Sequence, residues 1–291
     1  MRIRASLAAA TMSGAVALTA FGVSAAQADD ASSPAAAVRS HMLGKAKTQG
    51  KMSARSVYDI QVTKVTVNAG KDVVVGGTQK KKFNVYVTAT NPDGIYGVAA
   101  FLWHGDDLYS DGGVDGAIVS ENEGLSRDCQ RWSATTATCK VVLTADPKTD
   151  LYKSSLNGKW NVYAAATEDS ENGLEWATYQ NHWVKRAARI TSFNAAPEPV
   201  AKGKPVTVTG NLSMISWSHK KYYGYGSQKV KLQFKKAGAS SYSTIKTVTS
   251  SASGALKATV NATGDGTYRF SYPGNSIAST ATSSADHVDV R

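Results

Sequence analysis

Carboxylates and glycines are concentrated in segment 104–116, which is the best candidate for a metal site in the chain. Asp107, Asp111 and Asp115 follow one another at intervals of four residues, and Asp106 adds another carboxylate. Calcium takes several hard oxygen ligands and tolerates loose geometry, so these aspartates predict a calcium site. The Asp-x-Asp-x-Asp-Gly spacing of an EF-hand is absent.

The alternative for segment 104–116 is a polar loop, because turns favour aspartate and glycine whether or not a metal binds. A second acidic cluster, at residues 168–173, is open to the same two interpretations.

Aromatic and basic side chains are interleaved in segment 217–226. Such a surface could stack on sugar rings or on unstacked bases. Nucleic acid is the weaker option, since no known nucleic-acid-binding motif accompanies the segment. The alternative is that Trp217 and some of the tyrosines fill a core. The candidate ligand-binding residues are Trp217, His219, Lys220, Lys221, Tyr222, Tyr223 and Tyr225.

Positive charge is gathered in the last hundred residues. Residues 190–291 contain 12 basic and four acidic side chains, whereas residues 57–189 contain 14 basic and 16 acidic ones. Lys229, Lys231 and Lys235 alternate along one predicted strand and therefore share a face. Such a face predicts attraction to anionic polymers. The alternative is that these lysines only protect a sheet against aggregation.

Motifs of known hydrolases are absent: the chain contains neither G-x-S-x-G nor H-E-x-x-H. The five histidines are scattered, and His104 with Asp106 or Asp107 and a distant serine is the one conceivable triad. We therefore expect no catalysis, with a small secreted hydrolase or inhibitor as the alternative.

Two cysteines, Cys129 and Cys139, are the only ones in the chain. Outside the cytoplasm they would be oxidised together, and the short polar stretch between them predicts a disulfide across a β-hairpin. A redox pair would need closer spacing and an activating environment.

Residues 1–28 have the form of a secretory signal peptide: two arginines, an apolar run and an A-x-A site, with cleavage expected between Ala28 and Asp29. Residues 29–56 lack a strand pattern and predict a flexible basic arm. No later apolar run is long enough to span a membrane. We expect a protein that is secreted, or loosely associated with the cell wall.

Short strands with period-two hydrophobicity, separated by turn signals, fill the rest of the chain and predict an all-β fold. Segment 83–89 and segment 268–272 are typical, with apolar and polar residues alternating. The prolines of segment 194–199 predict a linker. We therefore expect two β-sandwiches, at residues 57–192 and 193–291.

The segment Gly266–Phe270 resembles the tyrosine corner of immunoglobulin-like domains, with Phe270 where antibody domains have a cysteine. The segment Gly158–Val162 has the same glycine, aromatic and apolar spacing. Two such copies predict two tandem immunoglobulin-like domains.

The chain also resembles a group of small secreted actinobacterial proteins over residues 60–291. The motifs that carry the resemblance are Pro-Glu-Pro-Val-x-Lys-Gly-Lys, segment 229–236, segment 253–256 and segment 266–269. It implies tandem immunoglobulin-like domains in a protein of the kind described as secreted or calcium-binding.

Together these features predict a non-catalytic, envelope-associated protein that contacts anionic extracellular polymers through its basic C-terminal domain, with calcium as the one candidate cofactor. A purely structural secreted protein is the remaining alternative.

Overall fold

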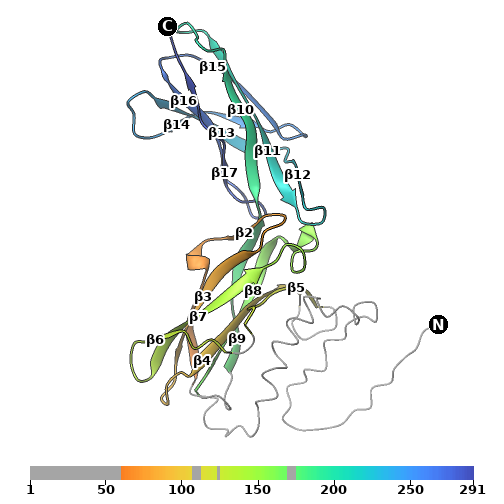
Figure 1. Cartoon of the computed structure of the whole chain (residues 1–291), viewed down its shortest axis with the longest axis vertical. Helices are drawn as coiled ribbons and strands as arrows, with labels where there is room; N and C mark the ends of the chain where they lie inside the picture. Colours follow the sequence, from red (N-terminus) through yellow and green to blue (C-terminus); the bar gives the residue numbers. More distant parts are fainter. Residues whose placement is uncertain (1–59, 107–112, 123–124, 169–174) are drawn as a thin grey trace, which may run out of the picture.

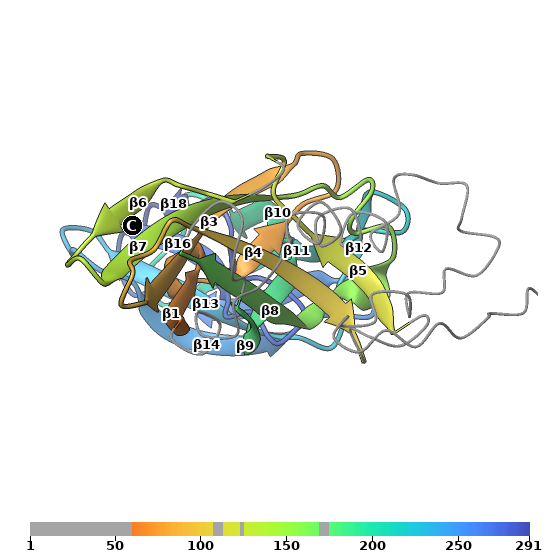
Figure 2. The ribbon, with the colours of Figure 1, turned by 90° about the horizontal axis from the view of Figure 1, so that it is seen from below.

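The computed structural model describes residues 60–106, 113–122, 125–168 and 175–291, with the backbone alone for residues 175–180. The signal peptide, its cleavage site at Ala28 and Asp29, and the basic arm predicted at residues 29–56 lie outside the described residues. Figure 1 shows two β-sandwiches arranged end to end, and Figure 2 shows that their strands overlap when viewed along the long axis.

The N-terminal sandwich is built from two sheets. One sheet has the order β1 (Gln61–Val67), β3 (Lys81–Thr90), β7 (Thr136–Ala145) and β6 (Cys129–Arg131). The other has the order β2 (Val73–Val75), β9 (Glu175–Arg186), β8 (Gly158–Thr167), β4 (Gly97–Gly105) and β5 (Val114–Ile118). Two short 3₁₀ turns, η2 (Asn68–Gly70) and η3 (Ser154–Leu156), connect strands.

This strand order is that of an immunoglobulin variable-type sandwich, whose sheets are ordered A-B-E-D and G-F-C-C′. Strands β1, β3, β7 and β6 take the places of A, B, E and D, and β9, β8, β4 and β5 take those of G, F, C and C′. The short β2 leaves the first sheet and pairs in parallel with β9. The prediction of an immunoglobulin-like fold is confirmed.

The period-two pattern produces the core directly. On β3, Phe83, Val85, Val87 and Ala89 are buried between the sheets while their neighbours face outward. Strand β4 differs, because its residues 97–103 are buried on both faces. That burial explains the continuous apolar run that the sequence shows there.

The C-terminal sandwich also has two sheets. One contains β10 (Ala188–Ala196), β11 (Pro205–Ser216), β12 (Lys221–Gly224) and β15 (Ala255–Asn261). The other contains β14 (Ser243–Thr249), β13 (Lys229–Lys236), β16 (Gly266–Tyr272), β17 (Ala281–Thr282) and β18 (Asp286–Val288). Phe270 is fully buried between them, in edge-to-face contact with Phe193 at 5.5 Å between ring centroids.

The boundary between the sandwiches lies earlier than the prolines suggest. Strand β10 pairs with β11 from Ala188 to Ala196, so residues 188–192 belong to the C-terminal sandwich and Asn194–Ala196 are strand, not linker. A single residue, Ala187, separates β9 from β10. The sequence does not indicate a domain boundary at Ala187, because the residues on both sides of it favour strands and no turn residue lies between them.

The disulfide between Cys129 and Cys139 is confirmed. The two residues are direct partners on β6 and β7. The bond fixes a hairpin at the edge of the first sheet, with the fully buried Cys139 in the core.

The two glycine–aromatic motifs occupy equivalent strands, β8 and β16, but their glycines have different roles. Gly158 has a φ of +127°, which side chains rarely adopt. Gly266 is needed for space, because a Cβ there would lie 2.4 Å from Phe234 and 2.5 Å from the backbone oxygen of Lys235. Beside Gly158, the Trp160 indole donates to the Leu156 carbonyl at 2.6 Å, much as a tyrosine corner bonds upstream backbone.

We predict that Gly266→Ala destabilises the protein by about 1–3 kcal/mol, since the new methyl group overpacks the space beside Phe234. Urea denaturation measures this change. Gly264→Ala is the matched control, because nothing lies within 4 Å of its Cβ position. Equal stability of the two variants would contradict the steric role of Gly266.

Candidate ligand-binding surfaces

The aromatic segment that begins at Trp217 forms the joint between the sandwiches. Trp217 follows the end of β11, yet its side chain is fully buried in the hydrophobic core of the N-terminal sandwich together with Ile215. Its indole N–H donates to the carbonyl of Val75, at 3.2 Å. Trp217 is therefore a core residue, as the alternative interpretation of this segment has it, and offers no surface to a ligand.

Lys220 is also used within the joint. Its ammonium donates to the carbonyls of Pro147 and Leu151, the latter at 3.2 Å. Burial lowers the pKa of Lys220, although the charge of Asp146 partly opposes this effect. This cation is held by the N-terminal sandwich and is not free to attract an anionic ligand.

Backbone hydrogen bonds complete the joint. Ala187 donates its N–H to Val75 at 3.1 Å, and its carbonyl accepts from the N–H of Ile215 at 3.0 Å. The backbone N–H of Trp217 donates to the Ser154 hydroxyl at 3.0 Å. The N–H of Arg186 donates to the carbonyl of Ile277 at 3.0 Å. The two sandwiches are thus connected by hydrogen bonds and by shared core packing as well as by the chain.

The tyrosines of the segment are divided between core and surface. Tyr222 packs partly against the N-terminal core, with the Arg189 guanidinium 3.8 Å above its ring. Tyr225 packs against the C-terminal core, and its hydroxyl accepts from Asn275 at 2.7 Å. Tyr223 is 50% exposed and contacts the ring of His219. Of the predicted residues, His219, Lys221 and Tyr223 remain exposed.

The predicted lysine face is present on the outer side of the β14–β13–β16 sheet. Lys229, Lys231 and Lys235 alternate with the buried Val230 and Leu232 and with the partly buried Phe234. The facing residues on β16 are Thr267, Arg269 and Ser271, and those on β14 include Thr247 and Thr249. We name Lys229, Lys231, Lys235 and Arg269 the cationic face.

Sequence reasoning did not single out Arg269 and Tyr242, which complete this surface. The Arg269 guanidinium lies 3.7 Å above the Tyr242 ring and donates to Gln233 at 2.8 Å, and Lys235 is 5.3 Å from the same ring. The alternation of segment 268–272 places Arg269 outward, but only the fold brings Tyr242 beneath it. Among the described residues, no ion pair joins a carboxylate to the cationic face.

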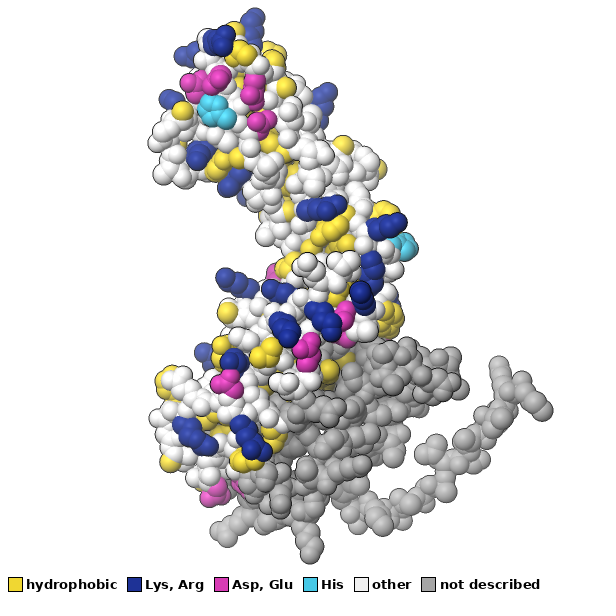
Figure 3. Space-filling view, in the orientation of Figure 1, with side chains coloured by type: hydrophobic (Ala, Val, Ile, Leu, Met, Phe, Trp, Pro, Cys, Tyr) yellow, Lys and Arg dark blue, Asp and Glu magenta, His cyan; other side chains and the backbone are white. Residues whose placement is uncertain are grey.

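The acidic residues of this sandwich gather near the free end of the molecule (Figure 3). Asp265 accepts from the N–H of Val290, and Asp286 accepts from the N–H of Ala195, each at 2.8 Å. Burial, together with the negative charges of Asp286 and Asp289, raises the pKa of Glu198. These carboxylates lie near the end of β16 at which Thr267 pairs with Lys235, so negative charge borders one end of the cationic face.

The predicted calcium loop is described only in part. Asp107 and Asp111 lie outside the described residues, and Asp106 is exposed beside them. The Asp115 carboxylate is 2.5 Å from His104 Nδ1 and 2.9 Å from Lys153 Nζ. Within the described ranges, no three His, Cys, Asp or Glu side chains are grouped as metal ligands.

Asp115 is thus engaged by two basic side chains, His104 and Lys153. Its burial raises the pKa, but hydrogen bonds from His104 and Lys153 and their charges outweigh burial and lower it. His104 bonds Asp115 across the β4–β5 pairing, in which His104 is the partner of Gly116, and Asp107 lies outside the described residues. The calcium site stays a prediction, and Asp115 would have to leave these partners to join it.

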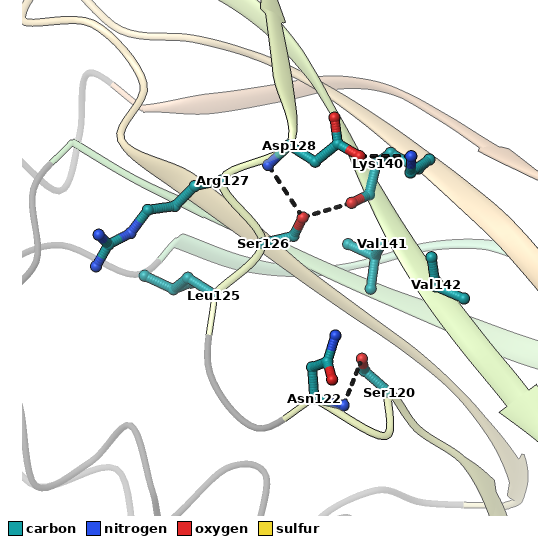
Figure 4. A pocket seen from close by; sticks show the side chains of 9 residues that line it. All are labelled: Ser120, Asn122, Leu125, Ser126, Arg127, Asp128, Lys140, Val141 and Val142. Carbon is teal, nitrogen blue, oxygen red and sulfur yellow. Dashed lines mark hydrogen bonds and ion pairs between the residues drawn. The ribbon is translucent and has the colours of Figure 1, made fainter.

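A cavity of about 300 Å³ lies between segment 120–128 and β7 (Figure 4). Its charged groups Asp128 and Lys140 pair with each other at 2.5 Å, and the Ser126 hydroxyl donates to the Lys140 carbonyl. Arg127 is stacked 4.2 Å above the ring of Tyr96. These polar groups already have partners, so the cavity presents no convergent set for chemistry.

Comparison with known proteins identifies no family. No family model and no curated protein matches the chain. Among solved structures, a marsupial T cell receptor has 11% identity and a TM-score of 0.34, with 79% of this chain and 73% of that chain covered. The D00–D0 domains of intimin have 15% identity and a TM-score of 0.26, covering 77% and 99%.

The Yersinia pseudotuberculosis adhesin InvE has 15% identity and a TM-score of 0.25, with 79% of this chain and 59% of that chain covered. Likenesses this weak say nothing about the function of the chain. The resemblance to secreted actinobacterial proteins is matched by no sequence comparison. In the part of the chain that the structure describes, no helix is long and apolar enough to cross a membrane.

We predict that Trp217→Ala uncouples the two sandwiches. Removing a buried tryptophan costs about 3–5 kcal/mol, and here the cost falls on the joint. Calorimetry should show one unfolding transition for the natural protein and two for the variant. Tyr223→Ala, in the same segment but exposed, should leave the single transition. A single transition for Trp217→Ala would contradict the proposed coupling.

We also predict that Lys153→Met raises the pKa of Asp115. In the folded protein the pKa of Asp115 lies below its value in the unfolded chain. The interactions of the ionised carboxylate therefore stabilise the fold at pH values above the unfolded-state pKa. This stabilisation is lost as pH falls through the folded-state pKa. Carboxyl NMR titration reports the change directly. Lys148→Met, at an exposed lysine, is the control. An unchanged Asp115 titration in Lys153→Met would refute the pairing.

Proposed function

We propose that this protein is a secreted, non-catalytic, envelope-associated binding protein that contacts anionic extracellular polymers through the cationic face. The observation that carries the proposal is a sheet face with four cations and no paired carboxylate among the described residues. Hydroxyl-bearing residues separate these cations, so the face offers both charge and hydrogen-bond donors to sulfate, phosphate or carboxylate groups.

The cations of the face are also held in position. Arg269 is fixed between Gln233 and the Tyr242 ring, and Lys229 Nζ is 3.0 Å from the hydroxyl of Thr249. Because side chains that are already ordered lose less entropy on binding, these contacts favour capture of a polymer chain. No carboxylate of the described residues forms an ion pair with these cations, so their charges are available to an anionic chain lying across the sheet.

Secretion fits this function. The signal peptide would deliver the protein to the compartment where wall polymers and acidic polysaccharides occur, and the disulfide is of the kind that oxidising compartments maintain. Calcium binding in the N-terminal sandwich is a separate proposal that rests on the aspartates of segment 104–116.

The binding of dextran sulfate, a soluble anionic polysaccharide, tests the cationic face. We predict that changing Lys229, Lys231 and Lys235 to glutamine weakens binding about tenfold, since exposed charge pairs contribute about 0.2–1 kcal/mol each. Binding of the natural protein should also weaken as salt rises, because salt screens exposed charges.

The matched control changes Lys202, Lys204 and Lys257, three exposed lysines outside the face, to glutamine. It removes the same net charge and should retain most of the affinity. Equal losses in the two variants would show that net charge alone, and not the face, attracts the polymer. Absence of binding in the natural protein would overturn the proposed function.

A purely structural role is the second candidate, and the joint is the observation that favours it. A tryptophan that follows β11 and is buried in the N-terminal core, together with a single connecting residue, suits a rigid spacer that holds its two ends apart. Retention on purified cell wall separates the candidates: release by salt supports polymer binding, whereas a protein that never associates with the wall supports the spacer.

A further inference from the structure

Three of the six large apolar side chains that are exposed in the described structure lie on one surface. Tyr86 is 38% exposed, Trp132 64% and Val142 36%. All three belong to the outer face of the β1–β3–β7–β6 sheet in the N-terminal sandwich. This surface is far in sequence and in fold from the cationic face.

Strand register places these residues together. Thr138 on β7 is opposite Thr88 on β3 and opposite Gln130 on β6, and Lys140 is opposite Tyr86. Alternate residues of a strand share a face, so Val142 follows Lys140 on the outer side. We name Tyr86, Thr88, Gln130, Trp132, Thr138 and Val142 the aromatic face.

The indole of Trp132 is held in place on this face. Its N–H donates to the Thr138 hydroxyl at 3.0 Å, and the Thr138 and Thr88 hydroxyls are 2.8 Å apart. The hairpin that carries Trp132 is fixed at its base by the disulfide between Cys129 and Cys139. An exposed ring that is already oriented loses little entropy when a ligand stacks on it.

Two of the three lysines beside the aromatic face are paired with carboxylates, whereas Lys64, exposed on β1 opposite Thr88, has no ion pair among the described residues. Lys140 is 2.5 Å from Asp128, and Lys82 on the same strand as Tyr86 is 2.9 Å from Glu121. Threonine hydroxyls and the Gln130 amide supply hydrogen bonds between the aromatic rings. A surface with flat apolar rings, neutral donors and acceptors, and only one lysine without a carboxylate partner at its β1 border matches a neutral ligand that is apolar on its flat faces and hydroxylated at its edges.

We propose that the aromatic face binds a neutral polysaccharide made of pyranose rings, with sugar rings stacked on Trp132 and Tyr86. The apolar C–H groups of a sugar ring cover an aromatic face, while its equatorial hydroxyls reach side-chain donors and acceptors beside it. The two sandwiches would then bind two chemically different polymers, an uncharged one at the aromatic face and an anionic one at the cationic face.

The test uses the mature full chain and three neutral probes: cellohexaose, chitohexaose and β-1,4-mannohexaose. Calorimetry should detect millimolar or tighter binding of at least one of them, equally strong at low and at high salt. Trp132→Ala should weaken that binding about tenfold, the equivalent of 1.4 kcal/mol. Trp132→Phe keeps a ring without the N–H and should retain part of the affinity.

Tyr152→Ala is the matched control, because Tyr152 is an aromatic side chain that is 39% exposed and lies outside both faces. The proposal would be overturned if no probe bound at millimolar concentration, or if Trp132→Ala left the binding unchanged. It would also be overturned by self-association of the protein that Trp132→Ala abolishes, because the face would then be a contact between copies of the chain. Binding of a neutral probe tests the aromatic face, and salt-dependent binding of dextran sulfate tests the cationic face. Either result can be negative while the other is positive, so the two proposals are distinguishable.

Discussion

The insertion of Trp217 from one sandwich into the core of the other is the contact on which the arrangement of this molecule depends. The Trp217 indole is fully buried in that core, so its N–H needs a hydrogen-bond acceptor within the protein. The carbonyl of Val75 is that acceptor. Lys220 meets the carbonyls of Pro147 and Leu151 from the same turn. These groups leave the joint little freedom to bend, because bending would expose the indole and break buried hydrogen bonds.

A rigid joint has a consequence for the two candidate surfaces. The cationic face belongs to the C-terminal sandwich and the aromatic face to the N-terminal one, so a fixed joint gives them a fixed separation and orientation. When two weak sites are held by a rigid connection, binding at one raises the effective concentration of ligand at the other, provided that a polymer can span the distance. A wall made of charged and uncharged chains would be such a ligand.

In segment 217–225, packing between the sandwiches uses side chains whose types would also suit ligand binding. Aromatic and basic residues there have the composition of a binding surface, but the joint recruits Trp217 and Lys220 and half-buries Tyr222. Composition alone does not distinguish these uses, because a tryptophan that closes a core and one that stacks on a ligand are the same residue type. Trp132 is the reverse case. It stands among polar hairpin residues, so the sequence did not indicate a binding role, but the fold leaves its ring exposed.

Local patterns in the sequence determined much of the fold: the strands with alternating burial, the hairpin disulfide and the glycine–aromatic motif at the start of β8 and of β16. These depend on neighbouring residues, and strand periodicity reports them directly. Only the tertiary structure decided the boundary at Ala187, the pairing of Asp115 with His104 and Lys153, and the Tyr242 ring beneath Arg269. Each of these depends on which distant strands become neighbours, and a one-dimensional pattern contains no record of that choice.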